Sequence, residues 1–125
     1  MNLPNDLLYT NDHEWVKIDD GIATIGITDF AQSELGDIIF VEFPEIEDEF
    51  EREDVFGTIE AVKTVADMLT PISGVITAVN PALEDSPELV NQDPYGDGWL
   101  IKLALRETED VSHLLTPETY GKLIN

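Results

Sequence analysis

Short apolar runs recur along the chain, and turn-forming residues separate them. Glu14–Ile18 and Ile22–Ile25 lie on either side of an Asp19-Asp20-Gly21 turn, which predicts a β-hairpin. Four further apolar runs predict strands: Ile38–Phe43, Val55–Ile59, Val75–Val79 and Trp99–Leu105. Many short strands with few helices indicate a mainly β domain of sandwich or barrel type.

Two regions predict helices. Residues 28–34 predict one short helix, because Thr28 is a favourable N-terminal cap and Gly36 follows its end. Near the C-terminus, Val111–Leu115 and then Pro117–Leu123 predict helix, with proline close to a helix start. We expect a single domain over residues 1–125, with a core at about 8–105 and a C-terminal helical segment at about 108–124.

The segment Glu60–Leu69 supports two interpretations. Its apolar residues recur near helical spacing, and no Asn-Gly or Asp-Gly pair marks a two-residue hairpin. Its β-branched residues favour strand instead, and Gly57 and Pro71–Gly74 bracket it at lengths that suit two strands. The local pattern therefore leaves open both a helix and a hairpin with Lys63 at the bend.

The charge balance narrows the possible partners. The chain has 27 acidic and 6 basic residues, a net charge of −21. Binding to nucleic acid or to an anionic membrane requires basic patches, so we expect neither. A strongly negative surface favours transient, electrostatically steered docking onto positively charged protein clefts.

Composition also bears on location. The sequence has no cysteine, which excludes a disulfide framework, a thiolate nucleophile and cysteine-ligated zinc. The first six residues lack the basic region and apolar run of a secretory signal, and no stretch has the length needed to cross a bilayer. We expect a protein of the bacterial or archaeal cytoplasm, and a monomer as the default state.

Lys63 is the most informative candidate for chemistry. It is one of four lysines and lies in an apolar, β-branched run, where a charge adds nothing to packing. At a hairpin tip its amine would be reachable by a modifying enzyme and then by several partners. Glu60 and Asp67 flank it and favour the ammonium form, so a separate ligase would have to supply the base. The plain alternative is an exposed, solubilising lysine.

No independent active site is visible in the sequence. His13 and His113 are a hundred positions apart and form no metal-ligand or nucleophile pattern, which favours structural or capping roles. The acidic run from Glu45 to Asp54 lacks the spacing of an EF-hand loop, which favours a solvated loop. Asp93–Trp99 is a dense turn that aromatic packing explains. We therefore expect a protein that is not an enzyme.

Motifs spread in order along the chain resemble the glycine cleavage system H-protein family. The matching stretches are His13-Glu14-Trp15-Val16, Ile25-Gly26-Ile27-Thr28-Asp29-Phe30-Ala31-Gln32, Leu35-Gly36-Asp37, Phe40-Val41, Pro44-Glu45, Phe56-Gly57, Glu60, Val62-Lys63, Asp67, Pro71-Ile72-Ser73-Gly74, Val79-Asn80, Leu89-Val90-Asn91 and Asp93-Pro94-Tyr95-Gly96-Asp97-Gly98-Trp99-Leu100. They run from about Leu8 to the end of the chain. A colinear match of this extent is more specific than the lysine segment alone.

The resemblance implies a barrel-sandwich hybrid of the lipoyl/biotinyl-domain type, a single lipoyl-carrier domain with a few short helices. It favours the hairpin over the helix and implies lipoic acid attached covalently to Lys63. It also implies a carrier role in glycine catabolism: the arm takes an aminomethyl group from glycine decarboxylase to an aminomethyltransferase, and dihydrolipoyl dehydrogenase reoxidises the dithiol. Lipoate ligase, or an octanoyltransferase with lipoyl synthase, would attach the cofactor.

The resemblance further implies that the loaded arm is sheltered against the carrier, with Glu14 and Asp67 receiving the aminomethyl nitrogen. Charge-assisted hydrogen bonds would stabilise that nitrogen, and exclusion of water would slow loss of the reactive carbon. An ordinary strand-end carboxylate is the plain alternative for Glu14. Ala61, Thr64 and Ala66 replace the serine, alanine and serine usual in the family, without removing the lysine or its acidic neighbours.

Three other readings compete with the carrier of glycine cleavage. A biotin carrier shares the hairpin design, but methionine typically stands on both sides of its lysine, where this chain has Val62 and Thr64. Some relatives act mainly as lipoyl donors to other proteins. An acidic protein-interaction module would leave Lys63 unmodified.

Overall fold

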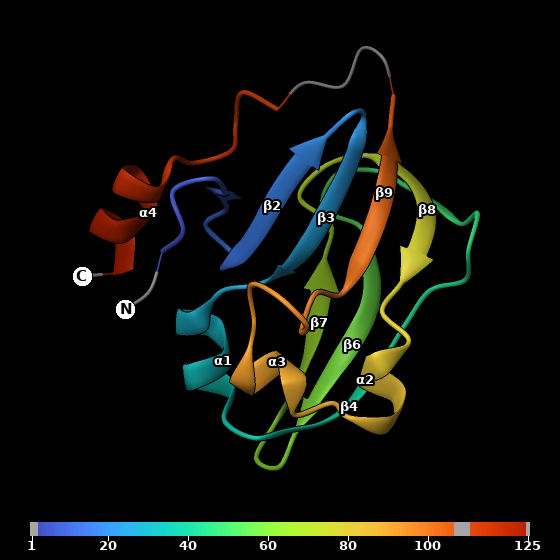
Figure 1. The fold of residues 1–125 in the computed structure, drawn as a ribbon, viewed down its shortest axis with the longest axis vertical. Helices are drawn as coiled ribbons and strands as arrows, with labels where there is room; N and C mark the ends of the chain where they lie inside the picture. Colours follow the sequence, from blue (N-terminus) through green and yellow to red (C-terminus); the bar gives the residue numbers. More distant parts are fainter. Residues whose placement is uncertain (1–2, 107–110, 125) are drawn as a thin grey trace.

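The computed structural model describes residues 3–106 and 111–124 (Figure 1). Its strands are β1 Leu8–Tyr9, β2 Glu14–Asp19, β3 Ile22–Ile27, β4 Ile38–Glu42, β5 Glu49–Phe50, β6 Val55–Ala61, β7 Val65–Leu69, β8 Gly74–Val79 and β9 Ile101–Leu105. Its helices are α1 Asp29–Leu35, α2 Ala82–Asp85, α3 Leu89–Gln92 and α4 Pro117–Ile124. The prediction of a mainly β chain with a few short helices is therefore confirmed.

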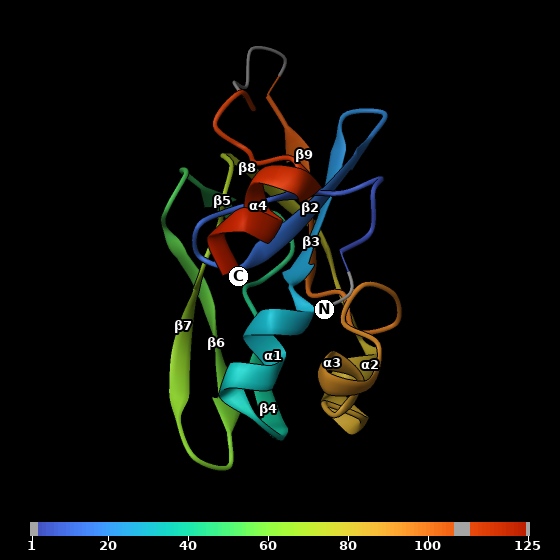
Figure 2. The same ribbon diagram turned by 90° about the vertical axis from the view of Figure 1, so that its left-hand side faces the viewer.

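The strands form two antiparallel sheets. One has the order β1-β2-β3-β9-β8-β5 and the other the order β4-β6-β7. Figure 2 shows the β6–β7 hairpin projecting on one side, with α1 between it and the short helices α2 and α3. The predicted hairpin at residues 14–25 is confirmed and extends to Ile27, which pairs with Glu14.

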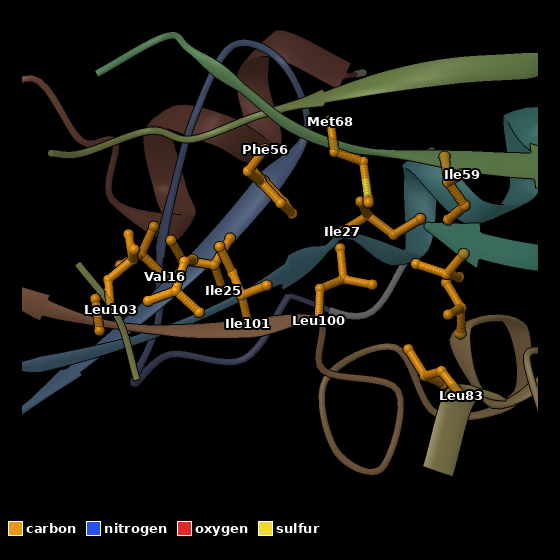
Figure 3. Close-up of a cluster of buried hydrophobic side chains, with 14 of the residues drawn as sticks. Val16, Ile25, Ile27, Phe56, Ile59, Met68, Leu83, Leu100, Ile101 and Leu103 are labelled. Atoms are coloured by element: carbon orange, nitrogen blue, oxygen red, sulfur yellow. The ribbon is translucent and has the colours of Figure 1, made fainter. Parts of the chain in front are cut away.

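Apolar side chains from the two sheets meet in one core. Figure 3 shows Phe56, Ile59 and Met68 of the smaller sheet facing Ile27 and Leu100 from the other side. All five residues are less than a tenth exposed. Burying side chains of this size stabilises the fold by roughly 1.5–3 kcal/mol each. The two sheets are therefore held at a fixed separation, which sets the space available beside α1.

The segment around Lys63 is a hairpin, and the helical alternative for residues 60–69 is wrong. β6 and β7 pair in antiparallel register from Val55↔Leu69 to Glu60↔Val65. Ile59 is 2 % exposed, whereas Val65 is 61 % exposed. Val65 pairs with Glu60, the neighbour of Ile59, so the two side chains lie on opposite faces of the sheet, and only the face of Ile59 is buried. Pairing across two strands thus outweighs the helical spacing of the isolated segment.

Helix α1 begins and ends where its sequence predicts. Thr28 has extended backbone and its Oγ1 accepts a hydrogen bond from the Ala31 N–H at 3.2 Å. The Gly36 N–H donates to Gln32 O at the other end, and Gly36 has φ 81° and ψ −158°. That conformation is essentially restricted to glycine, so the chain leaves the helix sharply at this residue.

The predicted helix at Val111–Leu115 is wrong. These residues form a turn, and Leu115 then makes an isolated antiparallel bridge with Tyr9. The Leu115 N–H donates to Tyr9 O at 2.7 Å, and the Tyr9 N–H donates to Leu115 O at 2.8 Å. The chance to pair with β1 decides the conformation here, whereas the helix predicted next is confirmed as α4. Residues 108–110 of the predicted C-terminal segment lie outside the described residues.

Candidate functional site

Lys63 lies at the tip of the β6–β7 hairpin, exposed beside Val62, which is 73 % exposed. The Ala61 N–H donates to Thr64 O at 2.8 Å and closes the turn. The Val62 N–H donates to Asp37 O at 3.0 Å, so the segment after α1 supports the tip from the side. Neither Val62 nor Lys63 has a positive φ. The hydrogen bond from Val62 to Asp37 supports a turn that lacks the Asn-Gly or Asp-Gly pair of a tight two-residue hairpin.

The side chain of Lys63 passes over the end of α1. A Cβ added at Gly36 would lie 3.5 Å from Lys63 Cε and 4.0 Å from Lys63 Nζ. Asn91 of α3 holds this corner, because its Nδ2 donates to Gly36 O at 2.8 Å and its Oδ1 accepts from the Ile38 N–H at 2.9 Å. The lysine side chain is thus exposed and lies against the C-terminal end of α1.

A cavity of about 400 Å³ lies along α1 between the two sheets. Its walls are mainly apolar, and they include Phe30, Ala31 and Leu35 of the helix. The sheets contribute Ile27, Phe56, Ile59, Ala66, Met68 and Leu100. α1 has seven residues, which at 1.5 Å per residue is about 10 Å. A lipoyl-lysine side chain is long enough to cover that distance, so an arm rooted above Gly36 could lie in this cavity.

The far end of the cavity is acidic, and Glu14 is its buried carboxylate. Glu14 is 6 % exposed, and its Oε1 accepts a hydrogen bond from Thr10 Oγ1 at 2.7 Å. Burial raises the pKa of this carboxyl from its ordinary 4.5 to about 7, because desolvation outweighs the hydrogen bond from Thr10. Glu14 also lines a second, polar cavity of about 80 Å³ on its other side. Near pH 7 this carboxyl is therefore only partly ionised, and a cationic group that entered the larger cavity would favour its ionised form.

Asp67 lines the same cavity, and Glu60 does not. Asp67 is exposed and pairs with Thr58, on edge strand β7. Because side chains alternate along a strand, Asp67 points away from the face that carries Met68. Asp67 therefore lies at the rim, while Glu14 lies inside. Glu60 is half-buried on β6, and Lys63 forms no salt bridge with either acid among the described residues.

The cavity also contains residues that sequence analysis did not select. Asp12 adds an exposed carboxylate beside Glu14, Glu34 adds another from the last turn of α1, and His13 forms part of the wall. His113 lies elsewhere, beside the small polar cavity, with Nε2 at 2.7 Å from Pro71 O. No sequence spacing connects Asp12 with Glu34, because a β-hairpin and the start of α1 separate them.

The sequence profile of the family described as Glycine cleavage H-protein matches residues 7–125. The chain belongs to the glycine cleavage H-protein family. It is a lipoyl carrier of the glycine cleavage system, a subunit without catalysis of its own, and family members hold lipoic acid covalently on a lysine. The family resemblance, the carrier role and the choice of lipoic acid are thus confirmed.

Relatives of similar length support the assignment. The chain is 54 % identical over 125 residues to the glycine cleavage system H protein of Listeria monocytogenes serotype 4a, and the alignment covers all of both chains. It is 51 % identical over 123 residues to that of Salinibacter ruber, covering 98 % of this chain and 99 % of the relative. These relatives are bacterial.

The crystal structure of a glycine cleavage system H protein from Mycobacterium marinum has the same fold. The two structures superpose with a TM-score of 0.88 at 39 % sequence identity, covering 95 % of this chain and 96 % of the other. The predicted barrel-sandwich hybrid is therefore confirmed. As a component of the glycine cleavage system, the chain works with its P, T and L proteins.

The described residues fit a covalent acyl arm on a lysine. They contain no cluster of three side chains able to hold a metal, and no helix among them is long and apolar enough to cross a bilayer. They do contain an exposed lysine over Gly36, at the end of α1, and a mainly apolar cavity along the same helix with Glu14 in its wall. This combination suits an acyl chain that ends in a cationic group.

Proposed function

We propose that Lys63 is the residue that carries the lipoyl group, and that the cavity along α1 shelters the loaded arm. The observation that carries the proposal is the position of Lys63 over Gly36, at one end of a cavity whose other end is Glu14. When bound, lipoic acid would supply the disulfide that accepts the aminomethyl group. The partners would be glycine decarboxylase, the aminomethyltransferase and dihydrolipoyl dehydrogenase in a bacterial cytoplasm.

The proposed roles of the cavity residues follow from their chemistry. Phe56, Met68 and Leu35 would pack against the acyl chain and exclude water from it. Glu14 would accept a charge-assisted hydrogen bond from the protonated nitrogen of the aminomethyl group, with Asp67 at the rim. A nearby ammonium favours the ionised carboxyl, so loading would draw the pKa of Glu14 down from about 7.

The intact mass of the protein tests the attachment site. After expression with lipoate and its ligase, we expect one lipoyl adduct on the parent and none on Lys63→Arg. Lys17→Arg is the matched control, because Lys17 is exposed on β2, away from the hairpin, and its adduct should persist. An adduct on Lys63→Arg would refute the assignment.

The lifetime of the loaded arm tests the shelter. In the parent, the aminomethyl group should be lost faster as the pH falls below 7 and passes the lowered pKa of Glu14 in the loaded protein, because Glu14 then becomes protonated. Glu14→Gln should shorten the lifetime about tenfold at pH 8 and remove this pH dependence, since a hydrogen bond to a charged group is lost. Glu42→Gln, an exposed acid of β4 outside the cavity, should leave both unchanged. Equal lifetimes of the loaded arm in Glu14→Gln and in the parent would rule out the proposed shelter by Glu14.

A further inference from the structure

The C-terminal helix reaches the wall of the cavity through Tyr120. This residue is 0 % exposed, and its ring stacks on Tyr9 with centroids 4.9 Å apart and planes 5° from parallel. Tyr120 Oη lies 2.8 Å from His13 Nδ1 and 2.8 Å from Thr28 Oγ1. His13 in turn contacts Phe30, with ring centroids 4.7 Å apart, and both line the cavity. A residue of α4 is thus one hydrogen bond away from the cavity, although it is 107 positions from His13 in sequence.

One arrangement of the hydrogen atoms in this cluster leaves neither buried hydroxyl without an acceptor. Thr28 Oγ1 already accepts from the Ala31 N–H, and among the described residues the only acceptor for its own hydrogen is Tyr120 Oη. Thr28 therefore donates to Tyr120. The hydroxyl hydrogen of Tyr120 then points to His13 Nδ1, which must be an acceptor, so the ring proton of His13 sits on Nε2.

The reverse arrangement leaves a buried donor without a partner. If His13 Nδ1–H donated to Tyr120 and Tyr120 donated to Thr28, the Thr28 hydrogen would have no acceptor at a residue that is 0 % exposed. An unsatisfied buried donor is strongly disfavoured. Tyr120 also keeps its proton, because burial raises the pKa of its hydroxyl.

The backbone of His13 is held as firmly as its ring. Its φ is 67°, a left-handed conformation that is uncommon for residues other than glycine. The His13 N–H donates to Thr10 O at 3.2 Å, and His13 O accepts from the Thr28 N–H at 3.0 Å. A strained backbone of this kind persists only where the surroundings fix it, and such positions cluster at functional sites.

A charged His13 would work against the proposed shelter. An imidazolium in the cavity wall would repel the ammonium of the arm and compete with it for Glu14. The acids around the ring, Asp12 and Glu34, favour the charged form, but burial outweighs them and lowers the pKa of His13 below its ordinary value. A hydrogen bond donated to Nδ1 acts in the same direction, because it stabilises only the neutral ring.

We propose that Tyr120 is a positioning residue that holds His13 as the neutral, Nε2-protonated tautomer, so that α4 controls how well the cavity retains the loaded arm. The control of arm retention by α4 rests on the proposed function of the cavity. The assignment of the tautomer does not, because it follows from the hydrogen bonds of the unmodified chain.

Imidazole ¹⁵N spectra of the unmodified full-length protein test the tautomer directly. The chain has two histidines, so a His113→Gln variant assigns the signals of His13. At pH 7 we expect His13 to show a protonated Nε2 and an unprotonated Nδ1. A protonated Nδ1, or an imidazolium at this pH, would overturn the proposal.

Tyr120→Phe tests the role of the hydroxyl, and Tyr9→Phe is its matched control. Both substitutions remove a hydroxyl from the same stacked pair, but the Tyr9 hydroxyl donates to Pro4 O at 2.8 Å and has no contact with His13. We expect similar losses of thermal stability. Only Tyr120→Phe should give a mixture of His13 tautomers, and it should shorten the lifetime of the loaded arm about fivefold, as the loss of one hydrogen bond would.

The results separate this proposal from the previous one. If both variants keep the parental tautomer and lifetime, Tyr120 has no positioning role, and the shelter by Glu14 is untouched. If Glu14→Gln leaves the lifetime unchanged while Tyr120→Phe still alters the tautomer, the cavity is not the shelter, but the hydrogen-bond relay from Thr28 through Tyr120 to His13 stands.

Discussion

At the hairpin tip, Val62 is 73 % exposed and Val65 is 61 % exposed, whereas at the far end of the cavity Glu14 is 6 % exposed and Tyr120 is 0 % exposed. The tip is held by backbone hydrogen bonds, one across the turn and one from Val62 to Asp37. The acidic end is held by side chains, which bond to one another through Thr10, Thr28 and Tyr120.

This difference fits the roles proposed for the two regions. A lysine that several partners must reach needs a defined backbone and little else around it, so most side chains at the tip can vary. A cavity that receives a cation needs a carboxyl removed from water, and the cost of burying it must be offset by the rest of the fold. We therefore expect substitutions at the two ends to change the free energy of unfolding by different amounts, with different signs and with a different dependence on pH.

Ile59→Ala should have the largest effect on stability. Ile59 is 2 % exposed in the core face of β6, and truncating such a residue costs about 2–5 kcal/mol, since it leaves a void in the packing. Val62→Ala, three residues further along the same hairpin, should change the free energy of unfolding by less than about 0.5 kcal/mol. Urea unfolding of the two variants measures both values, and a similar loss for both would remove the contrast between core and tip.

Glu14→Gln should stabilise the fold at high pH. The pKa of Glu14 is raised from 4.5 to about 7, so the folded state resists ionisation that the unfolded state undergoes. Below pH 4.5 Glu14 is protonated in both the folded and the unfolded state, so its burial does not lower the free energy of unfolding through ionisation. Stability is lost as the pH rises from 4.5 to about 7, and the cost is then constant at up to about 3 kcal/mol.

Glutamine keeps the acceptor for Thr10 and removes the charge. The melting temperature of Glu14→Gln should therefore equal that of the parent near pH 4 and exceed it increasingly up to pH 7. A constant difference in melting temperature between pH 4 and pH 7 would mean that burial of the Glu14 charge does not limit stability.

The same variant should be more stable but retain the loaded arm less well, because Glu14→Gln is also expected to weaken the shelter.

Gly36→Ala should have the smallest effect of the three on stability, together with an effect on modification. Its backbone conformation costs about 1–3 kcal/mol for any other residue. The added Cβ would also lie 3.5 Å from Lys63 Cε, so we expect slower lipoylation by the ligase. Gly21→Ala is the matched control, because Gly21 has φ +77° and a Cβ there meets nothing within 4 Å. Both variants should lose stability in unfolding experiments. Lipoylation at the parental rate in Gly36→Ala would show that the corner does not position the lysine.

Much of the architecture could be predicted from local patterns. The cap at Thr28, the glycine at position 36 and the hairpin through Asp19-Asp20-Gly21 each depend on residues that are close in sequence. Residues 111–115 were predicted wrongly because their conformation is set by pairing with Tyr9, about a hundred positions away. The turn at Lys63 lacked a local signal for the same reason, since its support comes from Asp37.

The candidate site divides in the same way. Lys63 stands out in the sequence because a charge in an apolar, β-branched run has no packing role, and the colinear motifs identified the family. Glu14 and Asp67 were assigned to the aminomethyl pocket only through that resemblance, although Asp67 was also noted as an acid flanking Lys63. Asp12, Glu34 and Tyr120 carried no signal, because the contacts that bring them to the cavity join elements far apart in the chain.

The amino-acid sequence alone determined that this is a mainly β chain with a conspicuous lysine at position 63, because alternation, caps and turns act over a few residues, and its colinear motifs indicated the family. Only the tertiary structure decided that Lys63 lies at an exposed hairpin tip over the end of α1, and that Glu14 is buried in the wall of the cavity along that helix. Burial and hydrogen-bond partners are properties of the assembled sheets and helices, and they underlie the raised pKa of Glu14 and the tautomer proposed for His13.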